Sequence, residues 1–256
     1  MKIIRWIAGI TVAAIAALAI WLYAPDKPRA ALEAAYPGEY RTVDGTRLRL
    51  RDTGPRDGPA VILLHGFGAS LETWEGWARP LSARYRVIRF DLPGFGLTGA
   101  DPTGDYSDAR AVQLMAGLMD QLGVARASVI GNSLGGRIAW TFAAQQPDRV
   151  ERLVLCDTAA VIGPASVWNE RVAGIRKSGL AAIAPGVMER WFTAPFRAAN
   201  PVIMQGCINM VARNTLDGYV GCALAVRDAD LRADGARIAA PTLVIVGDQD
   251  PATPPA

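Results

Sequence analysis

Ser133 is the residue of this sequence whose surroundings best suit a chemical reaction. It lies in the motif Gly131-x-Ser133-x-Gly135, after a β-branched run that predicts a strand and before residues 137–146, whose composition predicts a helix. A serine at such a sharp turn is exposed at a sheet edge, and small neighbours let two backbone segments pass close together. The pattern predicts a nucleophile. The alternative is a helix start rich in small residues with an unreactive serine.

A second motif, HGFG at residues 65–68, follows a predicted strand that ends at Leu64. Glycines at this place let backbone N–H groups turn toward a developing oxyanion, opposite the N–H of Leu134. His65 is the only histidine of the sequence. We interpret it as a structural residue of this loop, because a general base has to reach the serine from the other direction. The alternative is a tight turn without a catalytic role.

Carboxylates follow the last predicted strand, in the sequence GDQDPATPP at residues 247–255. A carboxylate at a strand end can orient an imidazole and stabilise it once protonated. We predict Asp250 as this acid and keep Asp248 as the second candidate; both have loop capping as the alternative role. Asp91, which begins the sequence DLPGFG, is interpreted as a turn cap.

The elements that would position these residues alternate along the chain. A hairpin is predicted around residues 44–45, and the expected strands that follow are 60–64, 86–90, 128–131, 152–156 and 242–246. The expected helices between them are 71–82, 107–122 and 134–146. Short apolar strands that alternate with amphipathic helices predict an α/β fold with a mostly parallel sheet covered on both faces.

Residues from about 159 to 230 interrupt this alternation, since they are helix-like and show no strand pattern. We predict that they form a helical cap over the carboxyl ends of the strands, where it would roof a substrate pocket. Trp191 and Arg190 are the candidate pocket residues of this cap. Arg190 and Arg137 are also candidates to attract an acidic substrate, with a surface or structural role as the alternative.

Composition excludes several function classes. The net charge of +3 in 256 residues, without a basic stripe, argues against nucleic acid as a partner. Three scattered cysteines without CxxC spacing argue against a disulfide framework and a zinc site, although one bridge between Cys207 and Cys222 stays open. We expect no metal and no cofactor.

The N-terminus has the pattern of a membrane segment. Residues 6–23 are uncharged and would span roughly 27 Å as a helix, close to the thickness of a bilayer core. We predict a membrane anchor over residues 1–24, with a cleaved signal peptide as the alternative, a linker over 25–38 and a globular domain over 39–256. Positive residues before the segment predict a membrane-anchored protein whose domain lies on the periplasmic or extracytoplasmic side.

Together, HGFG, DLPGFG, GNSLGG and GDQDPATPP have the order and spacing of the α/β-hydrolase superfamily, which the chain resembles over nearly all residues after the linker. The cap and C-terminal part resemble 3-oxoadipate enol-lactonases, and the N-terminal part resembles membrane-anchored hydrolases of the superfamily. The resemblance implies Ser133 as nucleophile, Asp250 as acid, and the N–H groups of Phe67 and Leu134 as the oxyanion hole.

The resemblance also implies a serine hydrolase that cleaves a small carboxylic ester or lactone, such as 3-oxoadipate enol-lactone, through an acyl-enzyme. One alternative is the hydrolysis of a carbon–carbon bond, because related hydrolases also contain GNSxGG. The family's histidine would follow a further strand and helix after Ala256, so we expect a sheet truncated before these elements and a chain without its base. The other alternative is therefore a membrane-tethered binding protein without activity.

Overall fold

The computed structural model of the protein describes residues 28–255. The chain divides into two compact units, one that ends at Pro37 and one that begins at Gly38. In the first unit the described residues form the short helix α2 (Arg29–Ala35), where Arg29 pairs with Glu33 one turn later at 2.9 Å. The stretch predicted as a linker thus includes two turns of helix.

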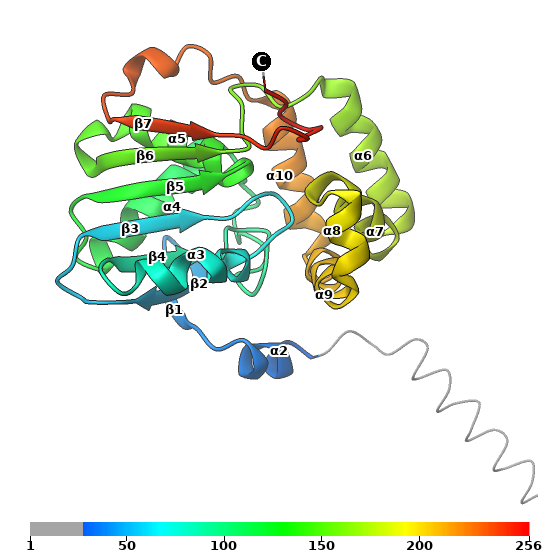
Figure 1. Cartoon of the computed structure of the whole chain (residues 1–256), viewed down its shortest axis with the longest axis horizontal. Helices are drawn as coiled ribbons and strands as arrows, with labels where there is room; N and C mark the ends of the chain where they lie inside the picture. The colour runs from blue at the N-terminus through cyan, green and yellow to red at the C-terminus, as the bar shows by residue number, and fades with distance from the viewer. Residues whose placement is uncertain (1–27, 256) are drawn as a thin grey trace, which may run out of the picture. The chain divides into compact units, whose positions relative to one another are not determined.

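Seven strands of the described chain form one sheet in the order β1-β2-β4-β3-β5-β6-β7 (Figure 1). Their bounds are β1 (Glu39–Val43), β2 (Thr46–Thr53), β3 (Ala60–Leu64), β4 (Arg86–Phe90), β5 (Ala127–Asn132), β6 (Val150–Cys156) and β7 (Thr242–Ile245). The strands from β4 to β7 pair in parallel, whereas β1 and β2 form an antiparallel hairpin that joins β4. The prediction of a mostly parallel sheet with an N-terminal hairpin is confirmed.

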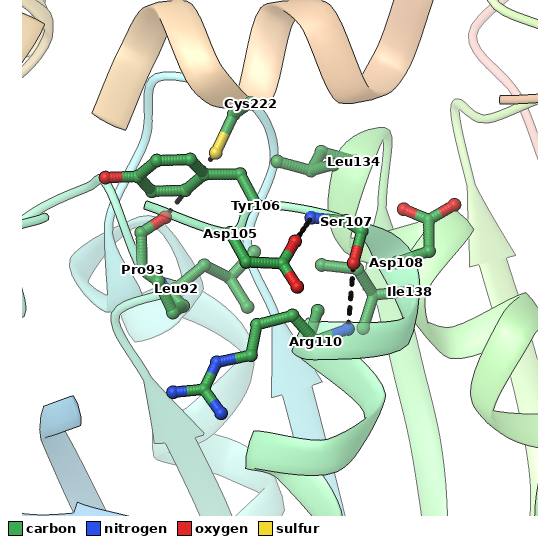
Figure 2. A pocket seen from close by; sticks show the side chains of 11 residues that line it. Leu92, Pro93, Asp105, Tyr106, Ser107, Asp108, Arg110, Leu134, Ile138 and Cys222 are labelled. Atoms are coloured by element: carbon green, nitrogen blue, oxygen red, sulfur yellow. Dashed lines mark hydrogen bonds between the residues drawn. The ribbon is translucent and has the colours of Figure 1, made fainter. Parts of the chain in front are cut away.

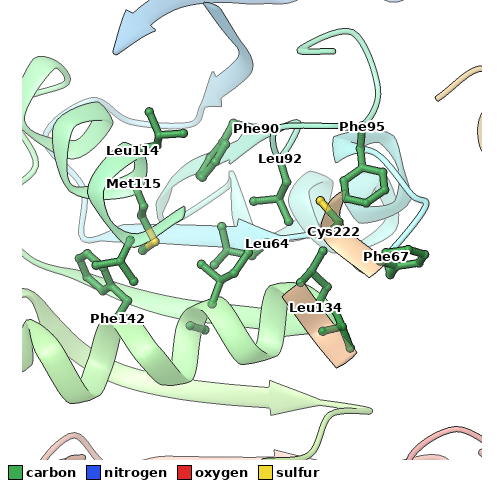
Figure 3. Packing of buried hydrophobic residues seen from close by; sticks show 14 of the residues in the cluster. Leu64, Phe67, Phe90, Leu92, Phe95, Leu114, Met115, Leu134, Phe142 and Cys222 are labelled. Atoms are coloured by element: carbon green, nitrogen blue, oxygen red, sulfur yellow. The ribbon is translucent and has the colours of Figure 1, made fainter. Parts of the chain in front are cut away.

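Helices cover both faces of this sheet. Successive side chains of a strand point to opposite faces, and those of β3 are apolar on both, so each face needs a cover. On one face, Leu64 packs with residues of α4 (Asp108–Gln121) and α5 (Leu134–Gln145), as Figure 3 shows. On the other face, Leu63 packs with Trp74 at the end of the 3₁₀ helix η1 (Leu71–Trp74) and with α3 (Glu75–Leu81). Both cores lie against β3 at the centre of the sheet, which fixes the ends of the central strands.

The predicted cap consists of helices between β6 and β7, gathered at the end of the sheet to which the parallel strands point (Figure 1). They are α6 (Ala165–Ser178), α7 (Leu180–Trp191), α8 (Ala194–Ala199), α9 (Pro201–Ala212) and α10 (Leu216–Asp228). Two short 3₁₀ helices, η2 (Pro147–Arg149) and η3 (Gly235–Arg237), precede β6 and β7. A Cβ on Gly218 would lie 2.2 Å from the Cα of Gly94, so these glycines let α10 pack directly against the loop after β4.

The membrane prediction needs a correction. Between residues 28 and 255 no helix is long and apolar enough to cross a membrane. The longest of them, α4 and α6, have 14 residues, whereas a span takes about 20. The expectation of a membrane-anchored protein with an extracytoplasmic domain is therefore wrong for the part of the chain that the structure describes. Residues 6–23, on which that expectation rested, lie outside the described residues.

Candidate active site

The carboxyl ends of β3 and β5 meet where the strand order reverses. From β3 the chain runs to β4 on one side, and it then returns past β3 to form β5 on the other side. Leu64 of β3 is in register with Gly131 of β5, so the loops that leave the two strands are neighbours. Open α/β sheets bind ligands at such a reversal. Ser133 leaves β5 at this point, and the HGFG loop leaves β3.

Ser133 has an unusual backbone conformation between β5 and α5, with φ 50° and ψ −114°. A positive φ costs a non-glycine residue about 1–3 kcal/mol and persists only where the surroundings enforce it. Here the N–H donates to the carbonyl of Cys156 at 2.9 Å, and the Ser133 carbonyl accepts from Thr158 Oγ1 at 2.8 Å. The half-buried side chain does not cap α5. The backbone N–H and carbonyl of Ser133 are therefore hydrogen-bonded, whereas its hydroxyl does not cap the N-terminus of α5.

Glycines allow the turn to form against its neighbours. A Cβ on Gly135 would lie 2.2 Å from the carbonyl oxygen of Leu64, which is backbone and cannot move aside. A Cβ on Gly66 would lie 3.5 Å from the Cβ of Ser133, so the HGFG loop lies beside the serine. The structure thus brings the predicted nucleophile and the predicted oxyanion loop together.

His65 is buried and both of its ring nitrogens are occupied. Nε2 accepts a hydrogen bond from the N–H of Leu92 at 2.9 Å, so Nδ1 bears the proton and donates to the carbonyl of Gly66 at 2.8 Å. Burial lowers the pKa of His65, which keeps the ring neutral. This histidine fixes the loops after β3 and β4. It is not available as a general base for Ser133, which agrees with the predicted structural role of His65.

The two residues predicted to form the oxyanion hole lie at the reversal point. Leu134 is the first residue of α5, so its N–H belongs to the helix end whose amides have no intrahelical acceptor and whose dipole favours negative charge. Phe67 belongs to the HGFG loop, and its buried ring packs edge-to-face on Phe95 and Tyr219, with centroids 5.4 and 4.5 Å apart. Their catalytic role stays a prediction.

Asp250 lies in the turn after β7, two strands away from β5. Its carboxylate accepts hydrogen bonds from the N–H of Ala252 at 2.7 Å and from the hydroxyl of Thr253 at 2.6 Å. The residue is half-buried, whereas Asp248 is exposed. Capping contacts and a catalytic role are compatible, because a carboxylate can accept about four hydrogen bonds.

Asp157 is a residue that sequence reasoning missed. It follows β6 with a positive φ of 46°, and its carboxylate accepts from the side chain of Asn132 at 3.3 Å and from the N–H of Gly247 at 2.9 Å. It therefore joins the ends of β5, β6 and β7 next to Ser133. The available signal was an acidic residue directly after an apolar strand, the same signal that selected Asp250.

The candidate pocket residues of the cap have different surroundings. Trp191, at the end of α7, is half-buried, and its ring lies 3.6 Å from a Cβ built on Gly68 of the HGFG loop. Arg190 is exposed. Arg137 is buried in α5 and pairs with Asp108 at 2.5 Å, which corresponds to its structural alternative. Only Trp191 of the three contacts the loop beside Ser133.

A small cavity lies beside the start of α5 (Figure 2). It is lined by apolar side chains such as Leu134 and Ile138 and by the loop at residues 105–108, where Asp105 accepts the N–H of Ser107 at 2.8 Å. Ser133 is not among its lining residues. The cavity therefore lies beside Leu134, and Ser133 does not line it.

The thiols of this domain are not a disulfide or metal site. The three cysteines are free, and burial raises the pKa of Cys156 to about 11, which makes it a poor nucleophile. Among residues 28–255 no group of three His, Cys, Asp or Glu side chains is placed to hold a metal ion.

Comparison with known proteins places this geometry among known folds. Residues 59–179 match a family model described as alpha/beta hydrolase fold. The chain is 33% identical over 212 residues to 3-oxoadipate enol-lactonase 2 of Acinetobacter baylyi. The aligned region covers 83% of this chain and 79% of that protein. The crystal structure of the enol-lactonase from Burkholderia xenovorans superposes with a TM-score of 0.82 at 36% identity, covering 85% of this chain and 84% of that one.

A thermophilic esterase from Thermogutta terrifontis superposes with a TM-score of 0.77 at 29% identity, covering 85% of this chain and 82% of that one. These three relatives extend over the sheet and the cap. The expected likeness of the N-terminal part to membrane-anchored hydrolases is not shown by them.

Proposed function

Because the chain belongs to the α/β-hydrolase family, we propose that it cleaves a small carboxylic ester or lactone with Ser133 as nucleophile. The observation that carries the proposal is the strained turn at Ser133, with φ 50°, beside the HGFG loop. In the proposed reaction the Ser133 oxygen attacks the carbonyl carbon while its proton passes to the general base. The bond between the acyl carbon and the alcohol oxygen then breaks, and that oxygen receives the proton, which releases the alcohol of an ester or opens the ring of a lactone. Water then hydrolyses the acyl-enzyme.

Charge develops on the carbonyl oxygen during this attack. The N–H groups of Leu134 and Phe67 are the proposed donors to it, and the first turn of α5 adds a favourable dipole. Because this first turn is packed against β3 through Gly135, the donors would be fixed before substrate arrives, so no reorganisation is needed during the reaction.

Asp250 is proposed as the acid that orients the general base. The ends of β5 and β7 are separated by two strand spacings, about 9–10 Å, a gap that one imidazole with a hydrogen bond on each side can bridge. His65 does not occupy this gap, because its two nitrogens are bonded to Leu92 and Gly66. The proposal therefore assigns the role of general base to a residue other than His65.

An enol-lactone is the proposed substrate class, supported by the 33% and 36% identity to proteins named as enol-lactonases. Carbon–carbon bond hydrolysis of a dienoic diketone is the alternative within the same mechanism class. Turnover of 3-oxoadipate enol-lactone, p-nitrophenyl acetate and a dienoic ring-cleavage product by the purified protein would separate these reactions. Lack of lactone turnover together with ester turnover would reject the enol-lactone and retain the esterase.

The test of the nucleophile is covalent labelling. A fluorophosphonate probe should modify Ser133, and mass spectrometry of the digested protein should locate the adduct. Ser133→Ala should abolish both labelling and hydrolysis, whereas Ser128→Ala, in the same strand β5, should keep both. Wild-type protein that neither reacts with the probe nor hydrolyses any of the three substrates would reject the proposed function.

A further inference from the structure

Arg171, on the cap helix α6, is a half-buried cation without a carboxylate partner among residues 28–255. This distinguishes it from the arginines buried in the core, which all contact an Asp or Glu at 3.2 Å or less. These are Arg49, Arg89, Arg110 and Arg137. Removing a guanidinium from water without a counter-charge is unfavourable, so its position needs a reason.

Aromatic rings surround this guanidinium. Its central carbon lies 5.1 Å from the ring centroid of Phe67, 5.2 Å from that of Trp168 and 5.9 Å from that of Tyr219. The rings also pack on one another edge-to-face, with 5.5 Å between Phe67 and Trp168. Cation–π attraction offsets part of the desolvation cost and holds the side chain in one place. The rings supply no negative charge.

The guanidinium retains donors that the protein does not use. Within the described residues it makes one hydrogen bond, from Nη2 to the Tyr219 hydroxyl at 3.2 Å. A guanidinium has five N–H donors in a planar fork, and a carboxylate is the ligand that takes two of them in parallel. A planar cation that is pre-oriented by aromatic faces suits such bidentate binding better than a lysine would.

This cation lies directly above the proposed catalytic loop. Phe67, which it contacts, follows Gly66, where a Cβ would be 3.5 Å from that of Ser133. Tyr219, which accepts its hydrogen bond, reaches the same loop, because its ring lies 3.2 Å from a Cβ built on Gly68. Arg171 is thus linked to the HGFG loop both through Phe67 and through Tyr219.

We propose that Arg171 binds a carboxylate of the substrate, so that the site takes anionic esters or lactones in preference to neutral ones of the same size. The inference rests on the proposed function, and it names the charge of the substrate and the residue that reads it. A carboxylate held at Arg171 would place the rest of a short acyl chain toward the HGFG loop. The rival explanation is that Arg171 only clamps the aromatic rings together.

Paired substrates separate these explanations. We compare kcat/KM for mono-p-nitrophenyl glutarate, which is anionic, and p-nitrophenyl valerate, which is neutral. Arg171→Gln should lower the value for the anionic ester by roughly tenfold to a hundredfold, the effect of losing hydrogen bonds between charged groups, and change that for the neutral ester less than twofold. Arg171→Lys should have an intermediate effect. Arg176→Gln, an exposed position of the same helix, is the matched control and should change neither.

An equal loss for both esters, or an unchanged ratio in correctly folded Arg171→Gln protein, would overturn the inference and leave the clamp. Thermal melts of each variant identify misfolding.

A binding measurement makes the test independent of catalysis. Adipate should quench the tryptophan fluorescence of the wild-type protein, and Arg171→Gln should weaken its binding at least tenfold, whereas 1,6-hexanediol should not bind. If the wild type hydrolyses neither ester and is not labelled at Ser133, the proposed function fails while adipate binding through Arg171 still stands. If adipate does not bind the wild type, the inference fails whatever the hydrolysis assays show.

Discussion

At the scale of single residues, Gly135 decides whether the turn at Ser133 can form. The carbonyl oxygen of Leu64 would lie 2.2 Å from an added Cβ, and that of His65 would lie 2.6 Å away. We predict that Gly135→Ala destabilises the protein by about 3 kcal/mol or more, since backbone would have to shift. It should also abolish probe labelling of Ser133. Urea unfolding followed by circular dichroism measures the first effect.

Gly174→Ala is the matched control for this prediction. Gly174 is likewise helical, in α6, but nothing lies within 4 Å of an added Cβ. An alanine there should raise stability by about 0.5–1 kcal/mol through helix propensity alone. Similar effects at both positions would show that the packing at Gly135 is not decisive.

Because of His65, the free energy of unfolding should decrease on mild acidification. Burial lowers the pKa of the folded imidazole below its usual 6.5, while the unfolded chain keeps the usual value. Between these two pKa values the unfolded state binds more protons, so the free energy of unfolding decreases as the pH falls through this window. The limiting slope is about 1.4 kcal/mol per pH unit.

Urea titrations at pH 7.5 and pH 5.5 would measure this slope. Since the sequence has one histidine, His65→Gln should remove the slope above pH 5.5 while lowering stability at both pH values. A wild-type protein equally stable at both pH values would contradict the assigned neutral, doubly hydrogen-bonded state of His65.

At the scale of elements, α4 and α5 are joined by an ion pair that the core encloses. Arg137 of α5 is 1% exposed. In the described part of the chain its Nε and Nη1 have no hydrogen-bond partner, and Asp108 of α4 provides its one counter-charge. We predict that Asp108→Asn destabilises the protein by about 3 kcal/mol, because it leaves a buried charge unpaired. Asp120→Asn, which removes an exposed carboxylate from its pair with half-buried Arg149, should cost less than about 1 kcal/mol. Equal costs, measured by urea unfolding, would contradict this reasoning.

Hydrophobic pattern predicted most core elements closely. The strands 60–64 and 86–90 and the helix 134–146 agree with β3, β4 and α5 to within one residue. The segment 71–82 was predicted as one helix but begins as the 3₁₀ helix η1 before α3 (Glu75–Leu81). Apolar residues every three to four positions do not distinguish a 3₁₀ turn from an α-helical one, so the sequence pattern could not reveal the break.

The candidate site could be predicted only where its signals were local. Ser133 and the HGFG loop each have a recognisable run of glycines beside a strand, and the topology brings them together. Asp157 gains its surroundings from residues far away in sequence, and so does Arg171 for two of its three aromatic neighbours. Trp168 lies three residues before Arg171 on α6, whereas Phe67 belongs to the HGFG loop and Tyr219 to α10, which no pattern within α6 indicates.

At the scale of the whole molecule, the sheet is protected unevenly from its centre to its margin. β5 lies between β3 and β6 and is covered by α5, whereas β7 pairs with β6 alone among the strands of residues 28–255. Apolar side chains of β7 meet solvent, with Leu243 57% and Val244 64% exposed. Within residues 28–255, β7 is thus covered less than the strands that support Ser133.

Deuterium uptake should report that gradient directly. In the 256-residue chain, β7 amides directed away from β6 should exchange through local opening within seconds to minutes, whereas amides of β5 should exchange only when the entire domain unfolds. Because Leu243 and Val244 are exposed to solvent, β7 should also be the first strand to unfold in urea. The nucleophile's strand would then outlast the strand that leads to Asp250, so a partly denatured sample would keep its serine turn after losing its acid.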